Sequence, residues 1–268
     1  MKLSSKYKTS SETAIRLPNS HIKELLILEC FTQNRHRLSQ LEIQKITNIS
    51  KSTVFRLVKT LAGLNYLKYD PGNKKYYLGP RVLSLGFSVL QSMEVREIAR
   101  PYMENLSREC NRSVNLLMLD RSEMVFIERI RVPGPRDYSI SIGSRIPVFN
   151  TAAGKAVLAY LDQAKFEQII NEIKKDERAT RYIGKNGRKL ITSLNGVRGS
   201  KYAINDEESL KGIRAIAVPI FSTEGVAYAM NLVVSAEEIS VDELRHSYAP
   251  KMVRMGKEIS ETLGYREK

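Results

Sequence analysis

The sequence has few of the residues and segments that mark several large classes of protein. Its 268 residues include only two cysteines, Cys30 and Cys110, which lie far apart and form no CxxC pair. This argues against a disulfide framework and a zinc site. No apolar run approaches the ~20 residues needed to cross a bilayer, and the polar start lacks the apolar core of a secretory signal. The sequence therefore predicts a cytoplasmic protein with no membrane partner.

Motifs of common enzymes are also missing. The three histidines lie in different segments, so neither a catalytic triad nor a metal-ligand spacing is present. There is no G-x-S-x-G elbow, and Ala153-Gly154-Lys155 lacks both the earlier glycine and the following Ser or Thr of a P-loop. The adjacent carboxylates of residues 206–208 are typical of a solvated turn. We expect a protein that is not an enzyme and that uses neither a cofactor nor a metal.

Positive charge is concentrated near the N-terminus. The chain has 43 Lys and Arg against 29 Asp and Glu, a net charge of +14, and residues 1–80 hold 14 of the basic residues but only 5 of the acidic ones. A local positive field favours phosphate backbones, because bound cations release counterions from them. A generally basic protein would not show this asymmetry, which therefore points to a nucleic-acid partner for the first 80 residues.

Residues 38–61 have the pattern of two short helices separated by a tight turn. Ser39 is the residue type that caps a helix, and Asn48 tolerates the left-handed conformation that ends one. The second segment carries one buried helical stripe, made of Val54, Leu57, Val58 and Leu61. This layout predicts a helix-turn-helix whose second helix enters the DNA major groove. A merely solvated basic helix face is the alternative.

A hairpin should follow the helix pair. The β-prone segments 66–69 and 75–78 flank the strong turn sequence Asp70-Pro71-Gly72-Asn73, which predicts the wing of a winged helix-turn-helix. Lysines near its tip would position the protein on phosphates without reading sequence. The candidate DNA-binding residues are Ser39, Gln40, Lys51, Ser52, Thr53, Phe55, Arg56, Lys59, Lys74 and Lys75. Of these, Lys51, Ser52, Thr53 and Arg56 would face base edges.

The regions around this unit complete the N-terminal half. Residues 1–18 are expected to form a flexible arm, and residues 19–79 the winged helix-turn-helix. Its first helix is predicted to bury Ile22, Leu25, Leu26 and Leu28. Residues 80–94 are expected to be a linker helix, since their apolar residues are too widely distributed for one buried stripe. Such a helix suits packing against a second subunit, and burial inside one domain is the alternative.

Residues 95–268 alternate between helical and strand-like patterns. Helices are expected over 98–110, 151–160, 163–174, 190–199 and 241–263, and strands over 114–120, 124–132, 138–142, 213–221 and 226–234. The polar stretch 176–189 is given no element, and Pro133-Gly134-Pro135 is expected to form a loop. Consecutive hairpin strands with helices at both ends predict an α+β fold, in which a mostly antiparallel sheet is covered by helices.

Three stretches carry a resemblance to a known family. ISKSTVFRLVKTLAGLNYLKYDPGNKKYYLGPRVLSLG, SIGSRIPVFNTAAGKAVLAYL and AINDEESLKGIRAIAVPIF, in this order, resemble the IclR family of bacterial transcription regulators over about residues 20–265. The resemblance implies a winged helix-turn-helix joined to a GAF-like effector-binding domain. It also implies a homodimer or homotetramer on a pseudo-palindromic DNA operator, with RNA polymerase as a further partner to consider.

The sequence departs from the family pattern at several positions. Lys201 and Asn48 stand where glycine is common, and Gln44 where alanine is common. In the acidic signature, Asn205 replaces the first acidic residue and Ala215 the usual small or sulfur residue before the strand. The changes on the DNA side are mild, because asparagine tolerates the turn. Those in the C-terminal domain bear on which ligand it binds.

The effector site is expected at the start of the helix near Thr151. Small residues there let a ligand approach the backbone, and free N–H groups at a helix N-terminus favour an anion. The residues expected to bind the effector, most of them implied by the resemblance, are Ala152, Ala153, Gly154, Asn205, Ile213, Ala215, Asn231 and Val233. Each has a structural alternative, such as helix packing for Ala152 or a satisfied core amide for Asn231.

The predicted function is that of a DNA-binding regulator that senses a small organic acid. Further similarity to the branch of the family that controls aromatic-acid catabolism favours an aromatic acid or its ring-opened product. The alternative is a small-molecule sensor or enzyme whose basic N-terminus contacts a protein or a membrane surface. Repressor or activator, and dimer or tetramer, stay open.

Overall fold

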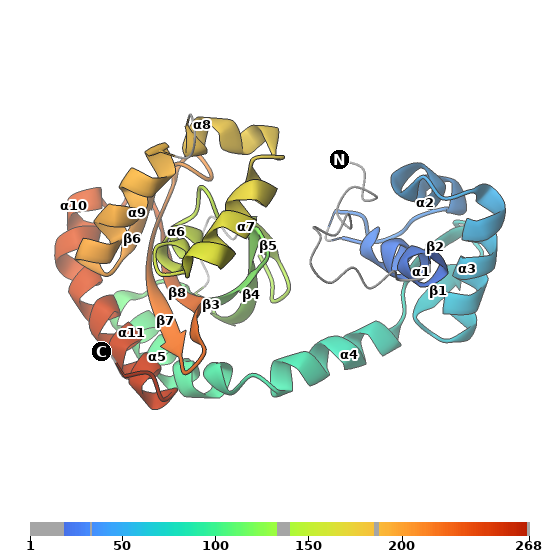
Figure 1. The fold of residues 1–268 in the computed structure, drawn as a ribbon. Helices are drawn as coiled ribbons and strands as arrows, with labels where there is room; N and C mark the ends of the chain where they lie inside the picture. The colour runs from blue at the N-terminus through green and yellow to red at the C-terminus, as the bar shows by residue number, and fades with distance from the viewer. Residues whose placement is uncertain (1–18, 33, 133–139, 185–187, 267–268) are drawn as a thin grey trace. The chain divides into compact units, whose positions relative to one another are not determined.

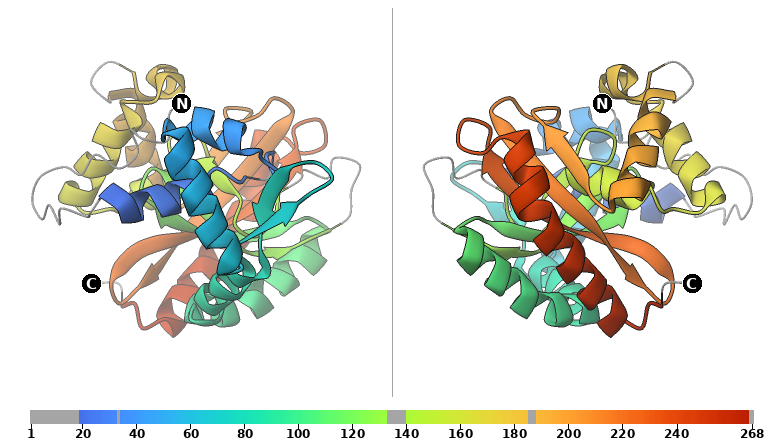
Figure 2. Two further views of the ribbon diagram at one scale, coloured as in Figure 1. Left: turned by 90° about the vertical axis from the view of Figure 1, so that its right-hand side faces the viewer. Right: turned by 90° about the vertical axis from the view of Figure 1, so that its left-hand side faces the viewer.

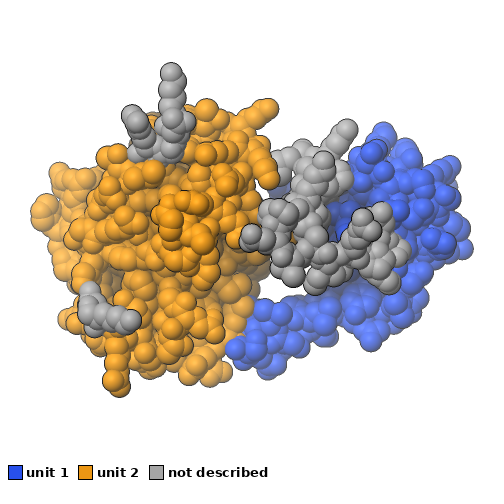
Figure 3. Space-filling model, in the orientation of Figure 1, with its two compact units in different colours: residues 1–92 blue, residues 93–268 orange. Residues whose placement is uncertain are grey.

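The chain divides into two compact units, residues 1–92 and residues 93–268 (Figure 3). The structure, a computed structural model, describes residues 19–32, 34–132, 140–184 and 188–266. The expected arm over residues 1–18 and the expected loop at Pro133-Gly134-Pro135 lie outside the described residues. Each unit has its own hydrophobic core, so each is described by itself.

Unit 1 begins with three helices, α1 (Asn19–Glu29), α2 (Gln40–Thr47) and α3 (Lys51–Gly63) (Figure 1). A capping box starts α2, because Ser39 and Glu42 bond reciprocally. Asn48 ends α2 with a left-handed backbone at φ 59°. The predicted stripe of α3 is fully buried: Val54, Leu57, Val58 and Leu61. The predicted helix-turn-helix is confirmed.

The buried face of α1 differs from the prediction. Leu25 is 58% exposed, whereas Leu26, Ile27 and Cys30 are buried in the core. The prediction was wrong by about one residue of helical phase. A run of four consecutive apolar residues, 25–28, does not fix the phase of so short a helix.

The wing consists of β1 (Leu67–Asp70) and β2 (Lys75–Leu78), paired antiparallel. The predicted hairpin is confirmed, with its first strand shifted by one residue. The Asp70 carboxylate accepts hydrogen bonds from the backbone N–H groups of Gly72 (3.0 Å) and Asn73 (3.3 Å). Leu38 pairs with Tyr76 through two backbone hydrogen bonds of 2.9 and 2.7 Å. The wing is thereby fastened to the segment that leads into α2.

Helix α4 (Pro80–Gln91) follows the wing directly. It starts at Gly79, where a Cβ atom would lie 2.2 Å from the carbonyl oxygen of Asn65, so only glycine fits this close approach. No residue of α4 is buried against the described part of the chain. Leu83, Leu85, Phe87 and Val89 are all exposed, Leu83 by 74%. A helix therefore forms over most of the predicted range 80–94, ending at Gln91, and these four apolar side chains remain exposed.

Unit 2 is built on one antiparallel sheet with the strand order β5-β4-β3-β8-β7-β6. The strands are β3 (Val114–Asp120), β4 (Glu123–Ile130), β5 (Arg145–Pro147), β6 (Ala203–Asp206), β7 (Ile213–Ser222) and β8 (Gly225–Ser235). Hairpins join β3 to β4 and β7 to β8, as the sequence predicted. The expected α+β fold with an antiparallel sheet is confirmed.

Helices cover both faces of this sheet (Figure 2). One face packs against α5 (Glu94–Cys110) and α11 (Ala249–Thr262). In the chain, α11 follows α10 (Val241–Glu243) and the π-helical turn η4 (Leu244–Tyr248). The other face packs against α6 (Ala152–Leu158), whose core extends to α7 (Gln163–Ile173), α8 (Thr180–Ile183) and α9 (Arg188–Ser200). Alternation along β7 separates the two faces: Ala217 belongs to the α6 core, and Val218 contacts α11 at Gly256.

Three expectations for unit 2 were wrong or incomplete. In the part of the segment 138–142 that is described, residues 140–142 form no strand. A turn with Gly143 at φ 87° intervenes, and the edge strand is β5 instead. Strand β6 was missed. The stretch 176–189 contains the short 3-10 helix η2 (Glu177–Ala179) and α8, where no element was expected.

Candidate DNA-binding surface and ligand cavity

The solvent side of α3 carries most of the predicted DNA-binding residues. Lys51, Ser52, Phe55, Arg56 and Lys59 are exposed, and Thr53 is half-buried. Lys59 Nζ lies 4.5 Å from the centre of the Phe55 ring. Within the described ranges, no acidic side chain forms an ion pair with the three cations of this face. Their charge is therefore available to an anion from outside the chain.

Two predicted residues at the start of α2 have different surroundings. Ser39 donates two hydrogen bonds to the Glu42 carboxylate, from its backbone N–H (2.7 Å) and from its hydroxyl (2.8 Å). These bonds, the backbone one first, lower the pKa of the Glu42 carboxyl. Gln40 instead lines a hollow of about 520 Å³ together with Lys51, Ser52 and Phe55 of α3. The structure thus brings four predicted residues together and uses Ser39 as a helix cap.

The wing lysines also differ from each other. Lys75 lies 3.6 Å from the Glu42 carboxylate, whereas Lys74, at φ 52° in the turn, is exposed and forms no ion pair with a described residue. Arg37 is a further cation here that sequence reasoning missed. It pairs with Asp70 at 2.6 Å and lies 4.7 Å from the centre of the Tyr77 ring. A lone arginine between helices gives no pattern that would have revealed it.

Unit 2 contains a cavity of about 430 Å³ over the face of the sheet that α6 covers. Six of the eight predicted effector residues line it: Ala152, Asn205, Ile213, Ala215, Asn231 and Val233. They come from the start of α6 and from the strands β6, β7 and β8. Phe126, Ile146 and Phe149 add apolar walls that were not predicted. The cavity is mostly apolar, as sites for small organic ligands usually are.

Ala153 and Gly154 lie outside the lining of this cavity. Both are fully enclosed in α6, and a Cβ atom on Gly154 would lie 2.1 Å from the carbonyl oxygen of Val148. Gly154 is therefore required for close packing of α6 on the chain before it. Thr151 caps the helix, since its hydroxyl accepts a hydrogen bond from the Gly154 N–H at 3.2 Å.

The two predicted amides in the lining have unlike roles. Asn205 is fully buried and donates through Nδ2 to the carbonyl oxygen of Asn150, while its Oδ1 accepts from Ser209 at 3.4 Å. Asn231 accepts a hydrogen bond at Oδ1 from Nδ2 of Asn115 at 2.8 Å. Its Nδ2 makes no hydrogen bond within the described residues.

Two arginines line the cavity that the sequence did not indicate. Arg178 is paired with Asp176 at 2.6 Å. Arg181 lies 4.6 Å from the centre of the Tyr182 ring and forms no ion pair with a described acidic residue. The signal was their spacing of three residues, which places both side chains on one side of a helical turn. It was overlooked because no helix was expected in this stretch.

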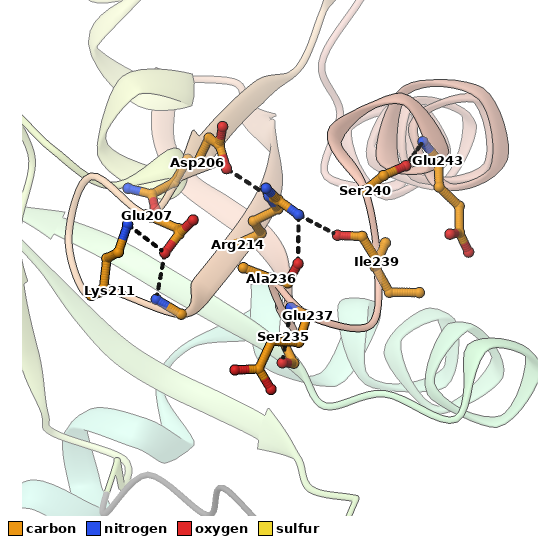
Figure 4. A network of polar contacts seen from close by, with 12 residues as sticks. Asp206, Glu207, Lys211, Arg214, Ser235, Ala236, Glu237, Ile239, Ser240 and Glu243 are labelled. Atoms are coloured by element: carbon orange, nitrogen blue, oxygen red, sulfur yellow. Dashed lines mark hydrogen bonds and ion pairs between the residues drawn. The ribbon is translucent and has the colours of Figure 1, made fainter.

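The carboxylates of residues 206–208 are exposed or half-buried, as expected of a turn, and each also has a bonding partner. Asp206 pairs with Arg214 at 2.6 Å, and Arg214 also donates to the carbonyl oxygens of Ala236 (2.7 Å) and Ile239 (2.9 Å) (Figure 4). Glu207 accepts a hydrogen bond from the Gly212 N–H at 2.7 Å, which holds the pKa of its carboxyl below the usual value. These bonds close the loop between β6 and β7.

The buried Lys155 fastens the same loop to α6. Its side chain is only 6% exposed, and Nζ donates to the carbonyl oxygen of Ile204 (2.7 Å) and to the Glu208 carboxylate (2.6 Å). The Tyr182 hydroxyl donates to the carbonyl oxygen of Glu208 at 2.5 Å. Burying an ammonium group without such partners would be strongly destabilising. Through them α6, α8 and the loop hold the cavity walls in place.

The described ranges hold few groups suited to other chemistry. They contain no group of three or more His, Cys, Asp or Glu side chains that could hold a metal ion. No helix among them is both long and apolar enough to cross a membrane. The two cysteines are unbridged, and burial raises the pKa of the Cys30 thiol to about 11. That thiol stays protonated near neutral pH, so it is a poor nucleophile.

A winged helix-turn-helix and an α+β unit with a mostly apolar cavity, on one chain, define the architecture of a ligand-responsive transcription regulator. Residues 23–71 match the "IclR helix-turn-helix domain", and residues 87–261 match the family "Bacterial transcriptional regulator IclR C-terminal". The chain belongs to the IclR family of bacterial transcription regulators.

Individual relatives agree with this assignment. The chain is 30% identical to the HTH-type transcriptional regulator XynR of Escherichia coli, over 91% of this chain and 96% of that protein. It is 31% identical to the p-hydroxybenzoate hydroxylase transcriptional activator of Acinetobacter baylyi, over 77% of each. The crystal structure of an IclR family regulator from Brucella abortus superposes with a TM-score of 0.81 at 25% identity, covering 93% of this chain and 94% of that one.

Proposed function

We propose that this regulator binds a pseudo-palindromic operator through α3 and the wing, and that a small organic acid in the cavity of unit 2 alters its operator binding or promoter activity. The observation that carries the proposal is the polarity of the cavity. Asn150 Oδ1, an acceptor on a lining residue, is buried and has no hydrogen-bond partner in the described chain. The walls leave two further polar groups without an ion pair or hydrogen bond there, the Arg181 guanidinium and Asn231 Nδ2. Both are donors, and donors select an anion.

On the DNA side, the proposal assigns base reading to the first turns of α3. Lys51, Ser52, Thr53 and Arg56 would contact base edges, and Gln40 and Phe55 would line the adjoining hollow. Lys59 and Lys74 would contact phosphates, because each is a cation with no internal ion partner in the described ranges. Ser39 and Lys75 complete the set and would lie next to the DNA backbone, although both also bond to Glu42.

The aromatic side chains in the cavity walls indicate which class of organic acid would fit. Phe126 and Phe149 give the cavity a flat apolar surface, and the Phe149 ring lies 5.6 Å from that of Tyr182. Aromatic rings favour stacked or edge-on contact with another ring. The relative named an activator of p-hydroxybenzoate hydroxylase transcription supports the same choice. We therefore favour an aromatic acid.

The proposal also covers assembly and partners. Because α4 exposes its apolar residues, we propose that residues 80–94 form the linker through which a homodimer or homotetramer assembles, between a DNA-binding domain of residues 19–79 and an effector domain of residues 95–268. As a bacterial DNA-binding regulator it would act in the cytoplasm. Contact with RNA polymerase would follow if it activates transcription.

The direct test is DNA binding measured with and without acid. Full-length protein is titrated into labelled DNA fragments from beside its own gene at increasing salt, with and without benzoate, 4-hydroxybenzoate and adipate. We expect one fragment to be protected at a specific site, and at least one acid to change its affinity. Protection of no fragment would remove the operator-binding part of the proposal, and an affinity unchanged by every acid would remove the effector part.

The variant Asn231→Leu separates the two parts. It removes the amide donor and fills part of the cavity, so the acid response should be lost while operator affinity stays within about twofold. Calorimetry with the responding acid checks the cause: acid affinity should fall by about tenfold or more, as loss of a charge-assisted hydrogen bond implies. An unchanged acid affinity would show that Asn231 does not contact the ligand.

A further inference from the structure

A pair of buried asparagines lies at the floor of the cavity. Asn115 of β3 and Asn231 of β8 face each other directly across neighbouring strands, which lie side by side in the centre of the sheet (Figure 1). They are only 3% and 4% exposed. Asn231 lines the cavity and Asn115 does not. Asn115 therefore touches the site only through its partner.

The hydrogen bond between the two amides has a direction. Asn115 Nδ2 donates to Asn231 Oδ1 at 2.8 Å. An amide has its acceptor and its donor on opposite sides of one carbon. With its oxygen held by Asn115, Asn231 must turn its NH₂ group the other way. If the pair were reversed, Asn231 would present an oxygen instead.

This arrangement leaves the side-chain oxygen of Asn115 without a hydrogen bond from the described residues. Its Oδ1 is enclosed and has no hydrogen-bond partner in the described chain. A buried acceptor without a partner is destabilising, and such groups are uncommon unless they serve a function. An apolar side chain at this position of β3 would have no such unpaired acceptor. Packing alone therefore gives no reason for an asparagine here.

We propose that Asn115 is a positioning residue that determines the polarity of the ligand site: by holding the oxygen of Asn231, it makes that side chain a fixed donor to the carboxylate of the effector. The inference rests on the proposed function, and it adds the residue that makes the cavity select acids. The same hydrogen bond excludes ligands that would need an acceptor at this point, such as amines.

The test is a double-mutant cycle on acid binding. Affinities of benzoate, 4-hydroxybenzoate and adipate are measured by calorimetry for the full-length protein, Asn115→Ala, Asn231→Ala and the double variant. Asn231→Ala removes the amide donor and should therefore lower the affinity for the acid about tenfold. Asn115→Ala should weaken it about three- to tenfold, since the Asn231 amide is then free to turn. The double variant should bind no more weakly than Asn231→Ala, because Asn115 acts only through Asn231.

A neighbouring residue supplies the control for general damage. Leu116 is fully buried and points to the opposite face of β3. Leu116→Ala should lower the melting temperature while leaving acid affinity within about twofold. Two outcomes would overturn the positioning role alone. One is a double variant whose loss of acid affinity equals the product of the two single losses, and the other is wild-type acid affinity in Asn115→Ala. Absence of binding by the wild-type protein to all three acids would overturn the proposed acid effector and this inference with it.

Discussion

Arg56 is the side chain whose removal should distinguish base reading from phosphate binding. It is exposed on α3, three residues after Thr53, and its charge has no ion partner in the described chain. A bidentate arginine contact to guanine contributes ~1–3 kcal/mol of discrimination. Arg56→Ala should therefore weaken operator binding by this amount and relax the preference at one base pair. Fluorescence anisotropy on a set of single-base operator variants measures both effects.

Lys74 provides the matched comparison for Arg56. It lies in the wing turn and is expected to touch only phosphate, so Lys74→Ala should weaken operator and random DNA equally and reduce the slope of log affinity against log salt by about 1. If Arg56→Ala behaved in the same uniform way, Arg56 would be a phosphate contact.

Lys201 is held in a backbone conformation that disfavours it. Its φ is 64°, in the left-handed region that favours glycine. This conformation is unfavourable by ~1 kcal/mol or more for a residue with a Cβ atom, and by little for glycine. Lys201→Gly should therefore raise the free energy of unfolding by about 1 kcal/mol, less the added entropy of the unfolded chain.

Urea denaturation of unit 2 measures the Lys201 effect, and Lys201→Ala is its control. Alanine removes the same ammonium group and its contacts but keeps the Cβ atom, so the difference in stability between Lys201→Gly and Lys201→Ala reports the backbone effect alone. A gain of the same size in both variants would assign the effect to charge rather than to the backbone.

Helices and strands differ in how far the sequence could predict them. The stripe of α3 and the asparagine that ends α2 are local signals, and both were correct. Strand β6 has four residues and was missed, because its pairing partner lies across a loop that carries no hairpin turn motif. The cavity arginines were missed with η2 and α8, the elements that carry them. Asn115 gave no signal at all, since a single asparagine within a strand acquires its role only from the opposite strand.

Helix α4 is the element whose environment the single chain leaves incomplete. Leu83 and Phe87 are 74% and 57% exposed, four residues apart on one side of the helix. If they pack against a second copy, burial of each contributes ~1.5–3 kcal/mol. Leu83→Ser combined with Phe87→Ser should raise the dissociation constant of the dimer by about 100-fold or more.

Sedimentation velocity over a range of concentrations checks the α4 prediction. Ser84→Ala is the control, because Ser84 is exposed on the same helix and its hydroxyl only returns to the carbonyl oxygen of Pro80 (3.5 Å). It should associate like the wild-type protein. An unchanged association of the double serine variant would place the interface between copies elsewhere on the chain.

At the scale of the whole molecule, the two units have separate cores and separate tasks. Acid can alter operator binding only if it binds two arrangements of the assembled protein with different affinity, and by linkage the operator then alters acid binding by the same factor. That coupling requires both units, whereas acid binding itself should require only unit 2. All residues proposed to contact the acid lie between Phe126 and Val233.

The fragment of residues 93–268 therefore tests the division of labour. Its sheet and both helical layers are complete without unit 1, so we expect it to fold cooperatively and to bind the responding acid within about threefold of the full-length affinity. It should show no measurable operator binding. In the full-length protein, acid affinity should change when saturating operator is added, and in the fragment it should not. A folded fragment that binds no acid would mean that unit 1 supplies part of the ligand site.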